Sequence, residues 1–325
     1  PNQKLSELTS LLVTGISDII EDFMPDLILV HGDTTTALCG ALAGYYSMIP
    51  VGHIEAGLRT MERYSPWPEE INRQMIDKLS NYLFAPTEDA KQNLIRERVT
   101  EENILVTGNT IIDALILIVK NIEKDQNLRG ELIEEIARKG YQNISMDENK
   151  NKTYILITGH RRENFGQGFL NICKALKILS FKYPEIDWIY PVHMNPNVRI
   201  PVSQNLNDVK NIYLIEPVEY GAFLYLISNS FAILTDSGGI QEEAPFFGKP
   251  VLIMRNTTER PEAIKAGTAK LVGTDTEKIV REMSNLIEDR KAYDLMAKAH
   301  NPFGDGFASS RIVNFILNKI NNYEL

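Results

Sequence analysis

The sequence has few cysteines, no excess of basic residues and no long apolar run. Its 325 residues carry 34 Lys and Arg against 43 Asp and Glu, a formal net charge of −9. Nucleic-acid binders usually present a basic face, so we expect no nucleic-acid partner. The two cysteines, Cys39 and Cys173, lie in predicted helices, which is typical of reduced core thiols in a cytoplasmic protein. No apolar run reaches the roughly 18 residues of a membrane span, so no membrane partner is expected.

Short apolar runs alternate with segments of helical spacing along the chain. Helices of this length between strands predict right-handed βαβ units and parallel sheets. A chain of 325 residues is long for one hydrophobic core, which favours two domains. We therefore expect an α/β fold with two Rossmann-like domains that face a cleft. Strands are predicted at 26–33, 50–57, 81–87, 104–110, 153–160, 187–193, 211–217, 231–239, 249–255 and 269–273.

The composition changes between the two series of strands. We predict an N-terminal domain over 1–120, a charged connector over 121–151 that ends in DENKNK, and a C-terminal domain over 152–308. The final helix, within 309–325, is expected to pack back on the first domain. A helical pattern follows Pro1 with no strand before it, and we expect a further segment to precede this point.

Three carboxylates stand in the phrases HGDTTT, HIEAGLRT and PWPEEINR: Asp33, Glu55 and Glu69. Asp33 and Glu55 end two apolar runs, and neighbouring parallel strands would bring them to one sheet edge, where open α/β sheets bind ligands. Together the three resemble a set of general acids and bases. Structural alternatives stay open. Asp33 could cap a helix, and Glu69 begins a segment of helical spacing, where the helix dipole favours a carboxylate whatever its function. Glu55 could pair with Arg59 or Arg73.

The phrase TDSGGIQEEA is the best candidate for a phosphate site. An apolar run leads into Ser237, Gly238 and Gly239, and a helix is predicted directly after them. Glycines let a ligand approach the backbone, and a helix start favours anions, although a plain tight turn is the alternative. Glu243 lies about one helical turn further and could accept hydrogen bonds from two vicinal hydroxyls, as on a ribose. For Glu242 we favour a solvated helix position.

The phrase TGHRRENFG places His160, Arg161 and Arg162 at the end of the first strand of the second series. These cations would supply the local positive field that an acidic chain otherwise lacks. His160 could transfer a proton or bind a phosphate oxygen, and a structural hydrogen bond is the alternative. His193, in YPVHMNP, holds an equivalent position, and both readings stay open for it.

The ordered phrases resemble one known family over nearly the whole chain. HGDTTTAL, HIEAGLRT, PWPEEINRQ, VTGNTIIDAL, GHRRENFG, YPVHMNP, TDSGGIQEEA and NPFGDG occur in the order typical of the non-hydrolysing UDP-N-acetylglucosamine 2-epimerases. The resemblance implies a glycosyltransferase-B-like fold with the UDP-sugar between its domains, a homodimer, and no metal, nicotinamide or other cofactor. The family also begins with a strand and a GTRPE-type loop whose cations reach the nucleotide, and neither is in this sequence.

The resemblance also implies a reaction and a set of site residues. Members interconvert UDP-N-acetylglucosamine (UDP-GlcNAc) and UDP-N-acetylmannosamine (UDP-ManNAc) for cell-surface polysaccharide, through loss and re-addition of UDP at a 2-acetamidoglucal intermediate. The implied catalytic residues are Asp33, Glu55, Glu69 and His160. The implied substrate contacts are Phe223 at the uracil, Ser237, Gly238 and Gly239 at the phosphates, Glu243 at the ribose, and Arg260 at the nucleotide. A second UDP-GlcNAc, which activates bacterial members, would lie near Arg161 and His193.

Other functions fit parts of the pattern. A related epimerase could act on another UDP-sugar, and a hydrolysing one would release free ManNAc and UDP. A glycosyltransferase of the same fold would also use TDSGGIQEEA, but that reading leaves the three carboxylates unexplained. A UDP-sugar-binding fragment without activity is the non-enzymatic alternative.

Overall fold

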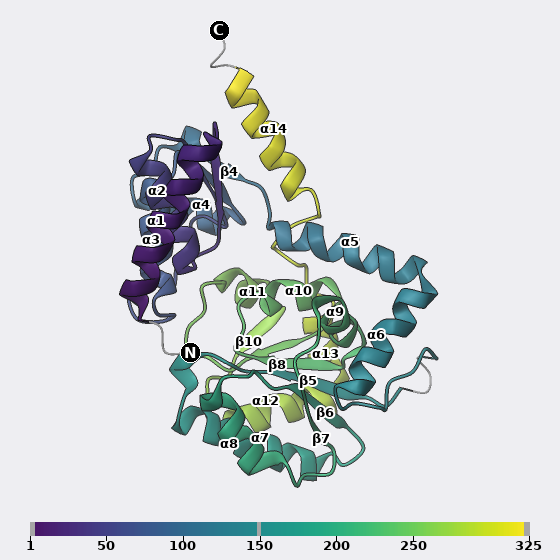
Figure 1. Cartoon of the computed structure of the whole chain (residues 1–325). Helices are drawn as coiled ribbons and strands as arrows, with labels where there is room; N and C mark the ends of the chain where they lie inside the picture. Colours follow the sequence, from purple (N-terminus) through teal and green to yellow (C-terminus); the bar gives the residue numbers. More distant parts are fainter. Residues whose placement is uncertain (1–3, 148–150, 322–325) are drawn as a thin grey trace. The chain divides into compact units, whose positions relative to one another are not determined.

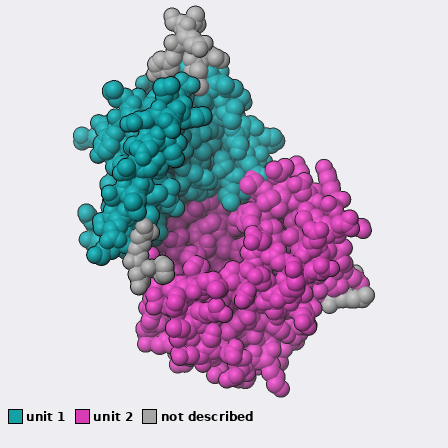
Figure 2. Space-filling model, in the orientation of Figure 1, with its two compact units in different colours: residues 1–113, 303–325 teal, residues 114–302 magenta. Residues whose placement is uncertain are grey.

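The chain folds into two compact units, each with its own parallel sheet. The computed structural model describes residues 4–147 and 151–321 (Figure 1). Unit 1 comprises Pro1–Asp113 and Phe303–Leu325, and unit 2 comprises Ala114–Pro302 (Figure 2). The predicted α/β class with parallel sheets is confirmed.

Unit 1 is built on a four-stranded sheet in the order β1-β2-β3-β4. Its strands are β1 (Ile28–His31), β2 (Val51–Ile54), β3 (Tyr82–Ala85) and β4 (Ile104–Val106). Its helices are α1 (Leu5–Phe23), α2 (Thr35–Tyr46), α3 (Glu69–Leu79), α4 (Glu88–Arg96), the 3-10 turn η1 (Glu101–Asn103) and α14 (Ala308–Asn321). Because every neighbouring pair is parallel, the carboxyl ends of all four strands lie at one edge.

Alternating side chains of β3 pack on opposite faces of this sheet. Leu83 and Ala85 join the buried cluster that also holds Leu94 of α4. Tyr82 and Phe84 point the other way, since successive side chains of a strand alternate. Their rings make edge contacts with Phe315 of α14, at centroid distances of 5.6 and 5.7 Å. The last helix thus belongs to the core of unit 1.

Unit 2 is built on a six-stranded parallel sheet in the order β7-β6-β5-β8-β9-β10, which is the strand order of the dinucleotide-binding doubly wound fold. Its strands are β5 (Tyr154–Thr158), β6 (Asp187–Pro191), β7 (Ile212–Ile215), β8 (Ala232–Thr235), β9 (Val251–Ile253) and β10 (Ala269–Leu271). Its helices are α5 (Thr110–Lys124, which starts in unit 1), α6 (Gln126–Arg138), η3 (Arg162–Asn164), α7 (Gln167–Lys182), α8 (Pro196–Leu206), α9 (Tyr220–Asn229), α10 (Ile240–Phe246), α11 (Pro261–Ala266), α12 (Thr276–Glu288) and α13 (Arg290–Ala297).

The strand order of unit 2 reverses between β5 and β8. All five residues of β5 and all four of β8 are buried. Thr158 and Thr235 pair at the carboxyl ends of these strands, and their hydroxyl oxygens lie 2.5 Å apart. Ligands of open α/β sheets bind at such a switch point. The loops after β5 and β8 are therefore the expected ligand-binding loops of unit 2.

The segment 121–151, expected from its composition as a connector, lies inside unit 2 and contains α6. Thr87 caps α4, because its hydroxyl accepts a hydrogen bond of 3.1 Å from the amide of Ala90. Cys39 and Cys173 are buried and unpaired with each other. None of the helices in the described part of the chain has the length and hydropathy that a membrane span requires.

Candidate functional site

Asp33 follows β1 and is held by helix α3. Its Oδ2 accepts two hydrogen bonds from the guanidinium of Arg73, one of them 3.0 Å long from Nε. Asn72 donates from Nδ2 to the main-chain oxygen of Asp33 at 2.9 Å. Helix α2 is capped by Thr34, whose hydroxyl accepts from the amide of Ala37. The capping alternative for Asp33 is therefore wrong, and its carboxylate remains 26% exposed beside a fixed cation.

Glu55 follows β2 in a left-handed backbone conformation, with φ of 72°. This conformation costs a residue with a side chain about 1–2 kcal/mol and is concentrated at functional sites. Oε1 accepts a 2.6 Å hydrogen bond from Nδ2 of Asn109, and Oε2 lies 3.7 Å from Nε2 of His31. Arg59 and Arg73, the arginines suggested as structural partners of Glu55, bind other carboxylates in the described chain. That alternative is wrong.

Glu69 is the first residue of α3, as its spacing predicts, and it differs from its neighbour Glu70. Glu70 is fully buried and accepts hydrogen bonds from the amides of Thr60 and Met61, each 3.1 Å long, and from Arg73. Its role is to hold the loop after β2. Oε2 of Glu69 is also buried, yet it has no hydrogen-bond partner among the described residues. A buried polar atom in a native structure usually has a hydrogen-bond partner, so Oε2 of Glu69 can accept a hydrogen bond from a water molecule or a ligand.

The loops that carry these carboxylates lie close together. A Cβ atom on Gly32, which precedes Asp33, would stand 3.3 Å from Oε2 of Glu55. Strands β1 and β2 are paired in register up to His31 and Ile54, so their loops leave the sheet side by side. The ion pair with Arg73 joins Asp33 to the helix that Glu69 begins. Asp33 and Glu55 thus lie at one sheet edge, and Glu69 begins the helix that Arg73 ties to Asp33. We call these three residues the carboxylate cluster.

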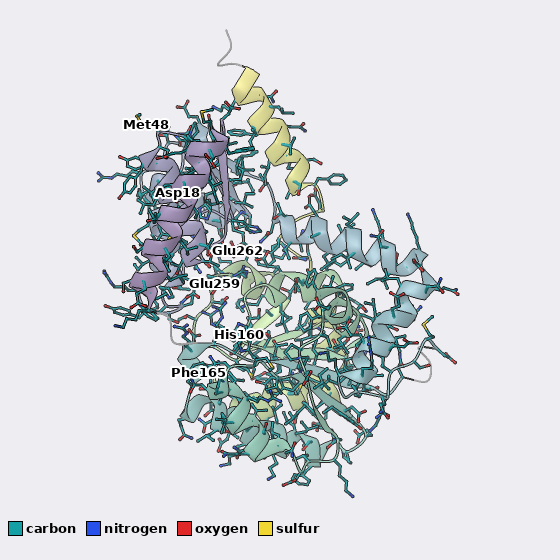
Figure 3. The ribbon with its side chains drawn as sticks, viewed as in Figure 1. Asp18, Met48, His160, Phe165, Glu259 and Glu262 are labelled. Carbon is teal, nitrogen blue, oxygen red and sulfur yellow. The ribbon has the colours of Figure 1, made fainter. Side chains whose placement is uncertain are left out.

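In unit 2, Asp236 organises the loop that follows β5. This residue comes directly after β8 and is fully buried. Its carboxylate accepts hydrogen bonds from the amides of His160 and Arg161, at 3.0 and 2.9 Å, and from Nδ2 of Asn164 at 3.0 Å. The end of the same loop is anchored by Phe165, which is labelled in Figure 3. The Phe165 ring packs on Phe169, with ring centroids 6.1 Å apart. The main chain around His160 is therefore fixed from both sides.

The His160 side chain is 41% exposed and stacks on His193, with ring centroids 5.5 Å apart and planes 24° from parallel. Burial lowers the pKa of His160, and the nearby Arg161, His193 and Arg255 act in the same direction. Asp236, whose Oδ1 lies 3.6 Å from Nδ1 of His160, opposes them. The net fall in pKa favours a neutral imidazole, which can donate one hydrogen bond to an anion.

The glycine loop after β8 is packed against charged side chains. A Cβ on Gly238 would lie 2.5 Å from both Nη1 of Arg260 and Oε1 of Glu259. Arg260 forms ion pairs with Glu259, at 2.7 Å, and with Glu242. Glu242 is fully buried, so the expectation of a solvated position is wrong. Helix α10 is short and lies against this arginine, and its first turn has no exposed side for Glu242.

Glu243 is 5% exposed and its Oε1 accepts a 2.7 Å hydrogen bond from the hydroxyl of Tyr220. Burial raises the pKa of Glu243 above its ordinary value, although Tyr220 and Arg260 oppose that rise. Phe223 lies one turn further along α9 and is partly exposed. Ser237 donates its amide to the hydroxyl of Thr235 at 2.9 Å. The loops of His160 and Glu259, both labelled in Figure 3, are neighbours, because Nη2 of Arg161 lies 4.0 Å from Oε1 of Glu259.

Three residues of these sites were missed in the sequence. Asn109 follows β4 and Asp236 follows β8. The strand-end rule, by which polar residues that follow parallel strands meet at one sheet edge, predicts Asp33 and Glu55 and applies equally to these two. Tyr220 has no comparable signal, because only folding brings its hydroxyl to Glu243. Within the described residues there is no group of three or more His, Cys, Asp or Glu arranged to hold a metal ion.

The comparisons with known proteins agree with one another. The family model described as UDP-N-acetylglucosamine 2-epimerase matches residues 1–317. The Yersinia pestis UDP-N-acetylglucosamine 2-epimerase is 52% identical over 318 residues, which are 98% of this chain and 82% of that protein. The Campylobacter jejuni enzyme is 50% identical over 321 residues, covering 99% of this chain and 82% of its own length.

Two solved structures are similar over nearly the whole chain. The UDP-GlcNAc 2-epimerase from Neisseria meningitidis bound to UDP-GlcNAc has a TM-score of 0.92 and 49% identity, and covers 98% of this chain and 83% of that one. The Methanocaldococcus jannaschii enzyme in complex with UDP-GlcNAc and UDP has a TM-score of 0.84 and 36% identity, with 98% and 82% covered.

The two parallel-sheet units define a protein of the glycosyltransferase-B-like class, the two-domain fold of these structural neighbours. The chain belongs to the UDP-N-acetylglucosamine 2-epimerase family, whose members are isomerases.

Proposed function

We propose that this protein catalyses the reversible epimerisation of UDP-GlcNAc at C2, giving UDP-ManNAc, without net hydrolysis. Membership of the family supports the substrate, as do related structures that hold UDP-GlcNAc and UDP. The observation that carries the proposal is the carboxylate cluster, with Glu55 held in a strained backbone conformation beside the Asp33 loop. A glycosyltransferase needs no such set.

The proposed reaction runs by elimination and re-addition. A base removes the C2 proton, the C2–H electron pair forms the C1=C2 double bond, and the C1–O bond breaks so that its electrons leave with UDP. UDP then attacks C1 of the 2-acetamidoglucal while an acid delivers a proton to the opposite face of C2. This chemistry needs one acid/base group on each face of the sugar, and we assign these roles to the carboxylate cluster, Asp33, Glu55 and Glu69.

We assign nucleotide binding to unit 2. Ser237, Gly238 and Gly239 would hold the diphosphate, and the imidazole of His160 would donate a hydrogen bond to it as UDP departs. The fixed main chain around His160 supports this, because a preorganised donor stabilises developing charge without reorganising. The remaining assignments are Glu243 at the ribose, Phe223 at the uracil, Arg260 at the nucleotide, and Arg161 and His193 at a second, activating UDP-GlcNAc.

We propose that the enzyme acts as a homodimer. Leu11 and Ile19 on α1 are each 65% exposed, and Met75 on α3 is 41% exposed. The same layer of unit 1 contains an apolar groove of about 710 Å³ between α1, α2 and α3. Exposed apolar surface of this kind marks interaction sites.

Both cysteines are buried and free, as in proteins of a reducing compartment, and we propose the cytoplasm as the location.

Solvent deuterium exchange at C2 tests the proposal. In deuterated buffer, the wild type is expected to place deuterium at C2 of both UDP-sugars and release no free ManNAc. Glu55→Gln removes a proton-transfer group, and exchange should fall by about 10²-fold or more. Glu62→Gln is the matched control, because Glu62 lies in the same loop with its side chain exposed. Wild-type protein that exchanges no C2 hydrogen would refute the function, and free ManNAc would indicate a hydrolysing epimerase.

A further inference from the structure

The interior of unit 1 contains a polar network behind the carboxylate cluster. His53 on β2 and Asp77 on α3 are both buried, with fully buried side chains. Nδ1 of His53 lies 2.6 Å from Oδ1 of Asp77, and Nε2 lies 2.9 Å from the main-chain oxygen of Gly32. A carbonyl oxygen only accepts, so Nε2 carries a hydrogen and donates it. The imidazole thus links helix α3 to the residue before Asp33.

The same carboxylate also holds the loop that carries Glu55. Oδ2 of Asp77 accepts a hydrogen bond from the amide of Gly57 at 3.3 Å and another from Nη2 of Arg59 at 2.7 Å. Burial by itself would raise the pKa of Asp77, yet His53 and Arg59 outweigh it and hold this pKa below its ordinary value. Asp77 is therefore a carboxylate that only accepts hydrogen bonds, and its two oxygens serve two different loops.

The network spans elements that are distant in sequence. His53 and Asp77 are 24 positions apart, and His53 and Gly32 are 21 apart. Neither His53 nor Asp77 is accessible to a ligand, since both are buried below the sheet edge where the strands end. A contribution to the reaction would have to pass through the loops they hold. Misplacement by about 1 Å of a reacting group can cost about 10²-fold in rate, so such a link has a measurable consequence.

We propose that His53 and Asp77 are positioning residues that tie the Gly32–Asp33 loop and the Glu55–Gly57 loop to helix α3, and so set the spacing of the Asp33 and Glu55 carboxylates. This inference rests on the proposed function for its kinetic consequence. The structural part, that the His53 ring restrains the Gly32–Asp33 loop, stands apart from any substrate.

Two substitutions of His53 separate its two hydrogen bonds. A Gln side chain extends its amide nitrogen about as far as Nε2 of histidine, so His53→Gln keeps a donor for the Gly32 oxygen. An Asn side chain reaches only as far as Nδ1, so His53→Asn keeps a contact to Asp77 and loses the one to Gly32. Tyr154→Phe in unit 2 is the matched control, because it also removes a buried hydrogen bond, of 2.7 Å from the Tyr154 hydroxyl to the Leu226 oxygen.

The three variants are compared in the full-length protein by two readouts. For C2 exchange, His53→Asn should lower kcat by about 10–100-fold with KM within about twofold, while His53→Gln retains most of kcat and Tyr154→Phe all of it. In hydrogen–deuterium exchange, the backbone amides of peptides that cover 31–34 should exchange faster in His53→Asn than in wild type. Their exchange rate should not change in Tyr154→Phe. If His53→Asn yields no folded protein, Asp77→Asn replaces it, with faster exchange expected over 55–59.

The outcomes distinguish this inference from the proposed function. If the wild type exchanges no C2 hydrogen, the proposed function fails, and the peptide exchange alone decides whether His53 restrains the loop. Equal kcat for His53→Asn and wild type would overturn the positioning role. So would equal losses in His53→Asn and His53→Gln, or a loss in Tyr154→Phe as large as in His53→Asn.

Discussion

Substitution of the two neighbouring glycines of unit 2 by alanine should have opposite effects on stability. In Gly238→Ala the new Cβ would lie 2.5 Å from Nη1 of Arg260 and 2.5 Å from Oε1 of Glu259. A Cβ on Gly239 would meet no heavy atom of the described residues within 4 Å, and the backbone there is already helical, with φ −59° and ψ −39°. The two variants differ by one position in the same turn.

The magnitude follows from the ion pairs around Gly238. Arg260 is 7% exposed and Glu259 is 2% exposed, and both are held by ion pairs, so neither can move away without breaking one. Breaking a buried ion pair costs about 3–5 kcal/mol, and partial relaxation brings our expectation to about 3 kcal/mol. Gly239→Ala should gain about 0.4–1 kcal/mol, because alanine adopts this helical backbone conformation without strain and has less conformational freedom than glycine in the unfolded chain.

Differential scanning calorimetry of the two variants tests this reasoning. At about 2–4 °C per kcal/mol for a domain of this size, Gly238→Ala should lower the Tm of unit 2 by about 6–12 °C. Gly239→Ala should leave it unchanged or slightly raised, while binding UDP more weakly in a calorimetric titration. A Gly238→Ala protein that melts with the wild type, or equal losses in both variants, would refute the packing argument.

Three further outcomes are expected. Burial raises the pKa of Glu243 above its ordinary value of 4.5, so the stability of wild type relative to Glu243→Gln should be greatest below pH 4.5 and should fall as the pH rises through the raised pKa. Urea midpoints of the two proteins, measured over this pH range, would contradict this if the advantage of wild type grew with pH. Asp236→Ala removes the carboxylate that accepts hydrogen bonds from the amides of His160 and Arg161 and from Asn164, each worth about 1.5–3 kcal/mol. Urea unfolding should therefore show a free energy of unfolding lower by about 3 kcal/mol or more. Thr34→Ala removes the cap of α2 and should cost about 1 kcal/mol by the same assay, with Thr34→Ser close to wild type.

Much of the fold could be predicted because its signals are local. Each of the ten predicted strands contains an observed one, since apolar runs between turn residues report burial on both faces of a parallel sheet. The strand-end rule also placed Asp33 and Glu55 correctly beyond β1 and β2. The same rule applied to Asn109 and Asp236 would have identified the partners of Glu55 and of the His160 loop.

The alternatives left open by the sequence needed the folded chain. Asp33 is paired with Arg73, 40 positions away, and the spacing of residues over a few positions cannot predict such a pair. Glu242 and Glu243 are adjacent and chemically alike, yet one binds Arg260 and the other binds Tyr220. Helix periodicity predicts on which side of α10 Glu242 and Glu243 lie, but it does not predict that the rest of the protein buries both sides.

The sequence by itself determined the class of fold, the order of its elements and the residue types at the strand ends, because these depend on hydrophobic periodicity and turn chemistry over a few positions. Only the tertiary structure decided which of those groups meet. The link from His53 to Asp77 and Gly32 exists because β1, β2 and α3 pack together. Glu55, with its positive φ, begins the loop that Asp77 binds at the amide of Gly57. Strain and buried charge persist only where many long-range contacts over-determine them, and those contacts are a property of the folded chain.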